Sequence, residues 1–373
     1  QNEYVLGVKS DNTLWAWGNS EGNGMLGQNN TVSYSSPVQL IGADPVWEKI
    51  NWGNNQNEYV LGVKSDGTLW AWGNNEHGRL GQNQVDVHYS SPVQIPGTTW
   101  SKSFTGSQRS AFCVKTDGSL WTWGSNDAGG ELGLNSPNNS AVSSPTQIGT
   151  DTTWTTTEDK VKRSMNYGAA FLKTDGTLWA WGRNTYGELG INQGPAQVYA
   201  ASSPCQVGTD TTWSVASCMR SGIAALKTDG TLWTWGRGRY GFTGHNSEID
   251  YSSPTQLPGT DWRTVSAAYG FFATKTDGTL WGAGRNNPGI LGQNNRTAYS
   301  SPVQIPGTTW DKAEMGFTLM ATKTDGTLWL CGNNTNGAMG NNNSVRYSSP
   351  VQLPGFSDPV NFSTGRRNWV IKR

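Results

Sequence analysis

Apolar and polar positions alternate over short stretches of this chain, and one such stretch recurs seven times. The clearest copy is Lys64–Asn75, which reads KSDGTLWAWGNN. Side chains alternate along a strand, so Leu69 and Ala71 face one way after the Asp-Gly pair. Trp70 and Trp72 then face the other way. Both faces are apolar, which is typical of a strand covered on both sides. The pattern predicts repeated, buried strands.

The Asp-Gly pair in each copy predicts a β-hairpin. A two-residue type I′ turn needs positive φ, which Gly accepts at no steric cost and Asp accepts cheaply. The copies are spaced by 55, 51, 58, 54, 48 and 48 residues. A period of about 50 residues indicates one closed array of repeats rather than separate domains. The copies start at Lys9, Lys64, Lys115, Lys173, Lys227, Lys275 and Lys323.

Two further signals divide each repeat into four strands. Every repeat carries Ser-Ser-Pro followed two residues later by Gln. Pro can open such a strand because its missing N–H lies outside the ladder. The predicted strands run from a Trp, up to the Lys, after Asp-Gly, and through the segment after Ser-Ser-Pro. That first Trp occurs at Trp47, Trp100, Trp154, Trp213, Trp262 and Trp310.

These motifs resemble the regulator of chromosome condensation repeat family, whose repeats carry a DG-x-LW-x-WG-x-N-x-x-G-x-LG pattern. The likeness spans essentially the whole chain. It implies an all-β, seven-bladed β-propeller of four-stranded antiparallel blades, with a ring closed by strands from both termini. The second Trp is replaced by Ala283 and Cys331, and the Leu-Gly element by Phe242–Gly244. We therefore expect looser packing in the sixth and seventh blades.

The whole chain, residues 1–373, is predicted to be a single propeller domain. Its repeat units start near residues 1, 47, 100, 154, 213, 262 and 310. Residues 360–365 are expected to supply the first strand that the N-terminal repeat lacks. The tail at residues 366–373 contains a second likeness to Tyr4–Lys9, which competes for the same place. Either the chain is cut from a longer one, or this tail pairs outside the ring.

Composition and charge narrow the choice of partner. Lys plus Arg equals Asp plus Glu, at 27 each, so no overall field attracts nucleic acid or an anionic membrane. No apolar run of about eighteen residues occurs, so membrane insertion is not expected. Hydrophobic residues make up 34%, and 48 Gly raise the small and apolar share to a normal globular level. A folded chain without a nucleic-acid partner is therefore predicted.

The cysteines and histidines show no chemical clustering. The four cysteines stand where sister repeats carry other, often apolar residues, so buried thiols are the simplest interpretation. A Cys205–Cys218 disulfide and a zinc site are the alternatives. No HExxH motif, nucleophile elbow or paired metal spacing occurs, so no catalysis, cofactor or metal is expected. The glycines of GNNEHGRLG open no helix, which argues against a phosphate cradle.

Loop lengths point to one working edge of the blades. The first and third connections of an antiparallel four-stranded blade leave one edge, and the second connection and the interblade link leave the other. The Trp-to-Lys distance varies from 13 to 19 residues, whereas the Asp-Gly turns and the links are nearly constant. Binding residues are usually placed on such variable loops. The candidate binding residues are Trp52, His77, Arg163, Tyr167, Tyr186, Arg237, Arg239, Tyr240, Phe242 and His245.

Charged residues are distributed unevenly between the two edges. A site for an anion or an acidic partner is one interpretation of the arginines on the variable edge. The alternative is a solvated face balanced by Glu158, Asp159 and Glu188. On the opposite edge, each repeated Lys is offset by an Asp two residues later, which indicates turn chemistry. The arginines that gather in repeats four and five are Arg163, Arg183, Arg220, Arg237 and Arg239.

The sequence predicts a non-catalytic propeller that presents loops to another protein or a surface glycan, outside the cell or on a virion. The family resemblance also implies alternatives: an intracellular guanine-nucleotide-exchange or chromatin-type regulator, or a secreted protein inhibitor of an enzyme. Exchange factors of the family carry a basic tail and long insertions. Its plant photoreceptors carry a Gly-Trp-Arg-His-Thr motif. This chain has neither feature, and its Trp residues are expected to be structural.

Overall fold

In the computed structural model, the described residues form β-strands joined by turns, loops and two short 3-10 helices. The chain divides into two compact units: Gln1–Thr185 with Val198–Thr211, and Tyr186–Gln197 with Thr212–Arg373. The residues that the structure describes are 4–8, 13–20, 22–40, 46–52, 59–106, 109–127, 129–136, 141–157, 160–161, 165–316, 318–334, 339, 341, 343–357, 359–364 and 368–372.

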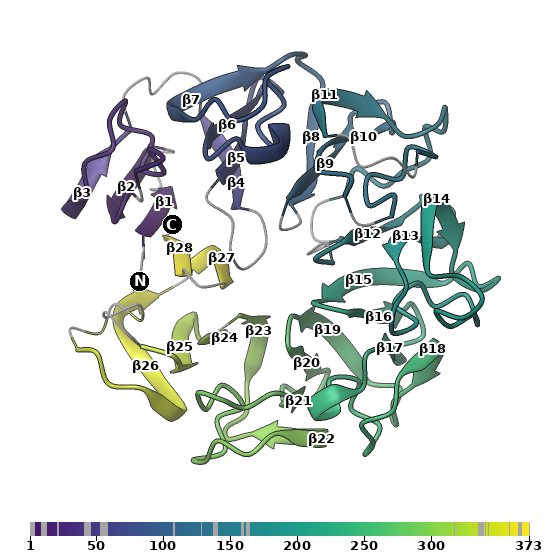
Figure 1. The fold of residues 1–373 in the computed structure, drawn as a ribbon. Helices are drawn as coiled ribbons and strands as arrows, with labels where there is room; N and C mark the ends of the chain where they lie inside the picture. Colours follow the sequence, from purple (N-terminus) through teal and green to yellow (C-terminus); the bar gives the residue numbers. More distant parts are fainter. Residues whose placement is uncertain are drawn as a thin grey trace. The chain divides into compact units, whose positions relative to one another are not determined.

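The first unit contains four antiparallel sheets whose strands follow in chain order (Figure 1). The first sheet has β1 (Tyr4–Val8), β2 (Leu14–Gly18) and β3 (Tyr34–Gln39). The second has β4 (Trp47–Trp52), β5 (Tyr59–Lys64), β6 (Leu69–Gly73) and β7 (Tyr89–Ile95). The third has β8 (Trp100–Gly106), β9 (Ser110–Lys115), β10 (Leu120–Gly124) and β11 (Val142–Gln147). The fourth has β12 (Gly168–Leu172), β13 (Leu178–Arg183) and β14 (Ala200–Gln206), and an isolated bridge joins Trp154 to Lys173 where its first strand was predicted.

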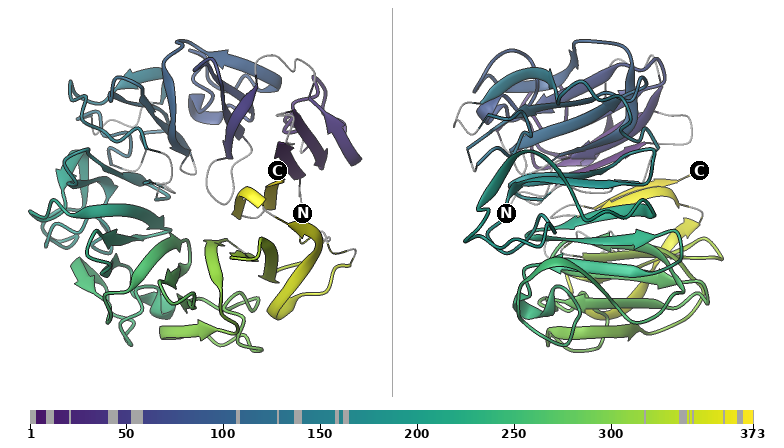
Figure 2. Two further views of the ribbon diagram at one scale, coloured as in Figure 1. Left: turned by 180° about the vertical axis from the view of Figure 1, so that it is seen from behind. Right: turned by 90° about the vertical axis from the view of Figure 1, so that its right-hand side faces the viewer.

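The second unit contains three four-stranded sheets and a hairpin (Figures 1 and 2). The sheets are β15 (Trp213–Met219) to β18 (Tyr251–Gln256), β19 (Trp262–Ala267) to β22 (Tyr299–Ile305), and β23 (Trp310–Met315) to β26 (Tyr347–Ser357). Their inner members are β16 (Gly222–Lys227), β17 (Leu232–Gly236), β20 (Gly270–Lys275), β21 (Leu280–Gly284), β24 (Thr318–Lys323) and β25 (Thr327–Gly332). The hairpin joins β27 (Pro359–Thr364) to β28 (Asn368–Lys372).

The division of a repeat into four strands is confirmed in five of the seven repeats, and the sheets that begin with β1 and β12 have three strands in the described residues. In the second sheet, β4 starts at Trp47, β5 ends at Lys64 and β6 follows the Asp-Gly turn. At the C-terminal end, the strand expected at residues 360–365 is β27. Its partner is the tail strand β28, with Phe362 opposite Val370. A pairing of this segment with the N-terminal repeat stays a prediction.

The Asp-Gly turns are not of the predicted type I′. Gly67 N donates to Lys64 O at 3.0 Å, Asp66 keeps a negative φ, and only Gly67 is left-handed, with φ of 75°. This geometry is a type I turn followed by a left-handed Gly, which makes a three-residue loop. The carboxylate of Asp66 accepts hydrogen bonds from Thr68 N at 2.9 Å and from Thr68 Oγ1 at 2.6 Å. These bonds hold Asp66 in the turn.

The second Trp of the LWxWG strand lies in the core and links one repeat to the previous one in repeats two to five, whereas Trp17 of the first repeat is half-buried. Trp72, Trp123, Trp181 and Trp235 are fully buried, whereas Trp70 is half-buried. Each of the four buried indoles donates its Nε1–H to a backbone carbonyl of the preceding repeat, at 2.9 to 3.1 Å. We call this contact the interrepeat indole bond. The accepting residues are Met25, Arg79, Glu131 and Glu188.

The last two repeats replace this Trp by residues that are fully buried, and the looser packing expected there stays a prediction. Cys331 is fully buried, and its Sγ donates to Ile290 O at 3.2 Å, in the same relation as the indole. In the sixth repeat, the ring of Phe271 lies against Gly244 as the ring of Trp235 lies against Gly190. The neighbouring strand β20 therefore supplies the aromatic ring that Ala283 lacks.

Candidate functional site

The two edges of the sheets differ as the loop lengths predict. In the second unit, Arg237 N donates to Ser221 O at 2.8 Å, so the first and third connections lie together. Trp262 N donates to Gly230 O at 3.0 Å, so the second connection lies beside the link to the next sheet. We call the edge with the first and third connections the loop edge. We call the edge with the second connection and the interblade link the turn edge. The first unit has the same arrangement, because Ser125 N donates to Arg109 O.

The turn edge carries a repeated structural motif. Lys227 Nζ lies 4.8 Å from the ring of Trp213 and 4.0 Å from that of Trp233. Thr231 Oγ1 accepts from Trp233 Nε1 at 2.8 Å and donates to Asp229 at 2.7 Å. The hydrogen bonds from the side chain and then the backbone of Thr231 lower the pKa of Asp229. The same contacts recur in repeats two to seven, which confirms that the Lys and Asp of these repeats serve the turn.

The loop edge of the second unit presents arginines stacked on tyrosines. The Arg237 guanidinium lies 4.4 Å from the ring of Tyr186, and that of Arg239 lies 4.6 Å from the ring of Tyr240. Arg285 stacks on Tyr269 at 5.7 Å. Planar guanidinium groups interact favourably with aromatic faces. We define the arginine–tyrosine surface as Tyr186, Arg220, Arg237, Arg239, Tyr240, Tyr269 and Arg285.

The arginines of this surface have no carboxylate partner in the described residues. The ion pairs described in the second unit join Arg263 to Asp311 and Lys275 to Asp261. Neither pair involves Arg220, Arg237, Arg239 or Arg285. Arg220 and Arg239 are exposed, and the other two are half-buried. The surface therefore offers four guanidinium groups that are not neutralised, and three of them, on Arg237, Arg239 and Arg285, are stacked on tyrosines.

The structure places four of the predicted residues in this surface and moves two away from it. Tyr186, Arg237, Arg239 and Tyr240 belong to it. Phe242 does not, because it is 4% exposed and packs in the core, one position before Thr243, which takes the place of the usual Leu. His245 is half-buried, with Nε2 2.9 Å from Thr234 Oγ1, and burial lowers its pKa. Because the His245 side chain packs against its own sheet in this way, it is a poor candidate for contacting a partner protein.

The sequence analysis missed Tyr269 and Arg285. One signal could have found Arg285: an Arg directly follows the Trp-Gly or Ala-Gly that ends the third strand in repeats four, five and six. In the first unit the same position, Arg183, lies 5.4 Å from the ring of Tyr167, so that predicted residue also stacks under an arginine. Arg163 and the side chain of Trp52 lie outside the described residues.

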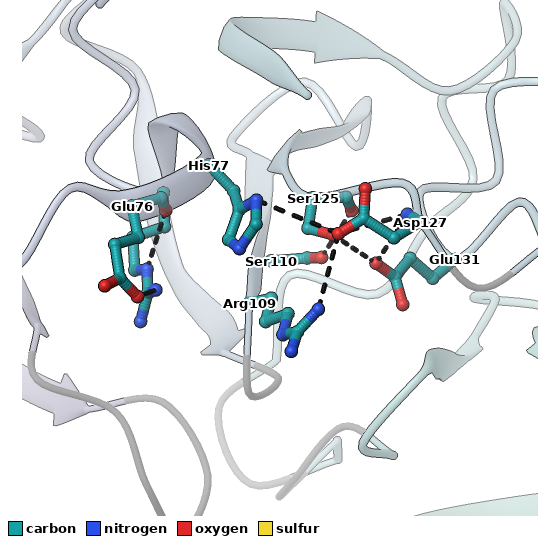
Figure 3. Close-up of polar contacts among 8 residues, drawn as sticks. Glu76, His77, Arg109, Ser110, Ser125, Asp127 and Glu131 are labelled. Carbon is teal, nitrogen blue, oxygen red and sulfur yellow. Dashed lines mark hydrogen bonds and ion pairs between the residues drawn. The ribbon is translucent and has the colours of Figure 1, made fainter. Parts of the chain in front are cut away.

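The predicted residue His77 belongs to a polar cluster in the first unit (Figure 3). Asp127 Oδ2 lies 3.7 Å from His77 Nδ1 and 3.3 Å from an Arg109 guanidinium nitrogen. Glu131 Oε1 accepts from Ser125 Oγ at 2.8 Å and from Asp127 N at 3.2 Å. Ser110 Oγ donates to Ser125 O at 2.9 Å. The cluster joins the loop edges of the second and third sheets.

Glu131 is the chemically unusual member of this cluster. It is 1% exposed, and its Oε2 has no hydrogen-bond partner among the described residues. Burial, opposed by the hydrogen bond from Ser125, raises its pKa to about 7. Glu131 therefore changes charge near neutral pH in a place that water does not reach.

Cysteines and metal ligands give no second site in the described part of the chain. None of the four cysteines forms a disulfide, and Cys113, Cys218 and Cys331 are buried, which confirms the buried-thiol interpretation for these three. Cys205 is half-buried, and the Cys205–Cys218 disulfide is not formed. No group of three or more His, Cys, Asp or Glu residues that could hold a metal ion occurs within the described ranges. No described helix is long and apolar enough to cross a membrane.

Comparison with known sequences identifies the repeats. The model of the "Regulator of chromosome condensation (RCC1) repeat" matches residues 66–113, 175–225, 229–273 and 325–369. The human E3 ubiquitin-protein ligase HERC2 is 28% identical over 272 residues, which cover 70% of this chain and 5% of the ligase. The ultraviolet-B receptor UVR8 of Arabidopsis thaliana is 26% identical over 268 residues, which cover 72% of this chain and 59% of the receptor.

Solved structures show the same fold. Prp20p from Saccharomyces cerevisiae aligns with a TM-score of 0.77 and 16% identity, covering 100% of this chain and 92% of that one. Human WBSCR16 aligns with a TM-score of 0.72 and 17% identity, covering 99% and 97%. These likenesses show an all-β propeller whose seven blades correspond to the seven sheets that begin with β1, β4, β8, β12, β15, β19 and β23. The chain belongs to the regulator of chromosome condensation (RCC1) repeat family.

Proposed function

We propose that this chain is a non-catalytic β-propeller that binds another protein through the loop edge of its blades. The observation that carries this proposal is the arginine–tyrosine surface, in which Arg237, Arg239 and Arg285 stack on tyrosines and meet no described carboxylate. Tyr and Arg dominate the energetics of protein–protein interfaces. Prp20p, which shares the fold, is described by its binding to Gsp1p and histones, and yeast RCC1 has been solved bound to Kap60.

We place this binding module outside the cell or on a virion. The repeats are rich in Asn and poor in Lys, and their SSPVQIPGTTW links resemble those of bacterial surface proteins and phage virion components. A surface glycan is the second partner class for such a location. Tyr186, Tyr240 and Tyr269 are the aromatic side chains of the surface that could contact a glycan.

A combined substitution tests the proposed function. When the Arg237→Ala, Arg239→Ala, Tyr240→Ala protein is immobilised, it should no longer bind the partner protein. Its melting temperature should be unchanged, because none of these side chains is buried. Arg263→Ala is the matched control, since Arg263 is exposed and lies at the start of β19. A shifted melting temperature with retained capture would contradict the assignment of the loop edge.

The alternative is guanine-nucleotide exchange inside a cell, which is the function that the family resemblance also implies. Release of a fluorescent GDP analogue from small GTPases measures this activity directly. We expect no acceleration by the propeller. Acceleration that the Arg237→Ala, Arg239→Ala, Tyr240→Ala protein retains would replace the proposal with the alternative.

A further inference from the structure

We propose that the arginine–tyrosine surface binds an acidic segment of a partner protein, whose carboxylates pair with its guanidinium groups. This inference deepens the proposed function and rests on it. It names the partner's chemistry and relies on Tyr269 and Arg285, two residues of the surface that were not predicted from the sequence.

The surface is built on one continuous backbone platform. Arg237 N donates to Ser221 O at 2.8 Å, which fixes the third connection of one blade to its first connection. The adjacent Arg220 N donates to Ala268 O at 2.8 Å, which reaches the next blade. Arg285 N then donates to Tyr269 O at 3.0 Å. Backbone bonds thus connect the residues that carry three of the four arginines.

Ring contacts extend this platform to the remaining arginine. The ring of Tyr269 lies 6.4 Å from that of Phe242, and the ring of Phe242 lies 6.0 Å from that of Tyr240. Phe242 is buried, and its ring contacts both Tyr240 and Tyr269. Arg239 donates to Tyr240 OH at 2.7 Å. The four guanidinium groups therefore belong to one contiguous surface.

The stacked guanidinium groups are prepared for carboxylates. Stacking restricts an arginine side chain, so less conformational entropy is lost when it binds. Tyr186, under Arg237, is itself held because its N donates to Glu188 Oε2 at 2.7 Å. A planar guanidinium can donate two parallel hydrogen bonds to one carboxylate, which is the strongest pairing available to it.

The surrounding charge is positive, and its few acids are partly committed. The loop-edge segments of the second unit contain six Arg, no Lys and three carboxylates. Glu188 is 4% exposed and accepts from Tyr186 N, and Asp250 accepts from Gly238 N at 2.9 Å. Glu248 is exposed. The six arginines are Arg220, Arg237, Arg239, Arg285, Arg296 and Arg346, and the segments are 186–197, 220–221, 237–250, 268–269, 285–298, 316–317 and 333–346.

An acidic protein segment fits this surface better than a nucleic acid does. Nucleic-acid binding draws on many basic contacts with the phosphate backbone, and this chain has equal numbers of basic and acidic residues. The positive charge is confined to a few arginines interleaved with phenol groups. That composition is the one enriched in protein–protein hot spots.

The test uses the full chain and three labelled probes: an oligoglutamate peptide, an oligoglutamine peptide of equal length and single-stranded oligothymidylate. Fluorescence anisotropy at low and at physiological salt measures each affinity. The wild-type protein should prefer oligoglutamate. Arg237→Glu with Arg285→Glu should weaken that binding about a hundredfold, at about tenfold for each arginine. Arg237→Lys with Arg285→Lys keeps the positive charge but loses the paired N–H donors of the guanidinium groups. This variant should weaken oligoglutamate binding by a smaller factor.

Arg296→Glu is the matched control, because Arg296 is exposed on the same edge but lies outside the stacked pairs. Equal weakening by Arg296→Glu would show a diffuse field and overturn the proposal. Tighter binding of oligothymidylate, or salt-sensitive self-association of the wild-type chain in sedimentation, would assign the surface to a nucleic acid or to a second copy. If the double Glu variant still captures the partner, this inference fails and the proposed function stands. If the wild type captures none, the proposed function fails.

Discussion

Replacing Glu131 by Gln should remove a pH-dependent loss of stability near neutral pH. Burial raises the pKa of Glu131 from 4.5 to about 7, so the folded chain favours the protonated carboxyl. A raised pKa means that stability is fully present below pH 4.5 and is lost as the pH rises through about 7. At about 1.4 kcal/mol per pH unit, the loss is about 3 kcal/mol by about pH 8.

The variant keeps the local contacts but not the titration. Its amide oxygen can accept from Ser125 Oγ and Asp127 N as Glu131 Oε1 does. Its amide nitrogen replaces Oε2, which has no described partner, at a roughly constant cost of about 1–3 kcal/mol. His77, Arg109 and Asp127 are present in both proteins, so their contributions largely cancel in the difference.

Urea unfolding followed by Trp fluorescence, at a series of pH values, measures this difference. The free energy of unfolding of wild type minus that of Glu131→Gln should fall by about 3 kcal/mol between about pH 5 and about pH 8. Glu248→Gln, at an exposed position, is the control and should give a flat difference. A flat or rising difference for Glu131→Gln would refute the assignment of a protonated, buried carboxyl.

Three further predictions test the packing. Trp72→Ala should cost about 3–5 kcal/mol of unfolding free energy because this indole is fully buried. Trp70→Ala should cost only about 1–2 kcal/mol, because that ring is half-buried and mainly stacks with a lysine; chemical denaturation gives both values, and equal costs would contradict the difference in burial. Thr231→Val removes a hydrogen bond that lowers the pKa of Asp229, so an NMR titration should show this pKa rising toward 3.8; an unchanged value would exclude that bond as a cause. Maleimide should label Cys205 first in the native protein, because the other three thiols are buried, and mass spectrometry that finds one of those labelled first would refute their burial.

The strands were predictable because their signals are periodic and local. Alternation around Trp70 and Trp72, the Asp-Gly pair and Ser-Ser-Pro lie within single repeats, so each strand could be placed from its own residues. The turn type was not predictable in this way. Asp-Gly suits both a type I′ turn and a type I turn with a following left-handed Gly. In this structure the type I turn with a left-handed Gly is the one that forms, and the Thr68 side chain donates a hydrogen bond to Asp66 in it.

The candidate site was only partly predictable because several of its contacts join residues that are distant in sequence. Tyr186 and Arg237 stack although they are far apart in sequence, and nothing local in either repeat indicates the pairing. Phe242 looked like an exposed loop aromatic, yet it is buried in the core. In the same way, Phe271 compensates for Ala283 from the adjacent strand. Substitutions that rely on a neighbouring strand leave no signal at their own position.

The interrepeat indole bond makes each joint between repeats indifferent to the side chain it meets. The acceptor is a main-chain oxygen, and it belongs in turn to Met25, Arg79, Glu131 and Glu188. A duplicated or exchanged repeat can therefore dock onto a new neighbour without matched mutations. The segment QNEYVLGVKSD, present at both Gln1–Asp11 and Gln56–Asp66, is what such copying would leave behind. The loop sequences of one repeat can then change in evolution while its backbone contact with the neighbouring repeat is kept.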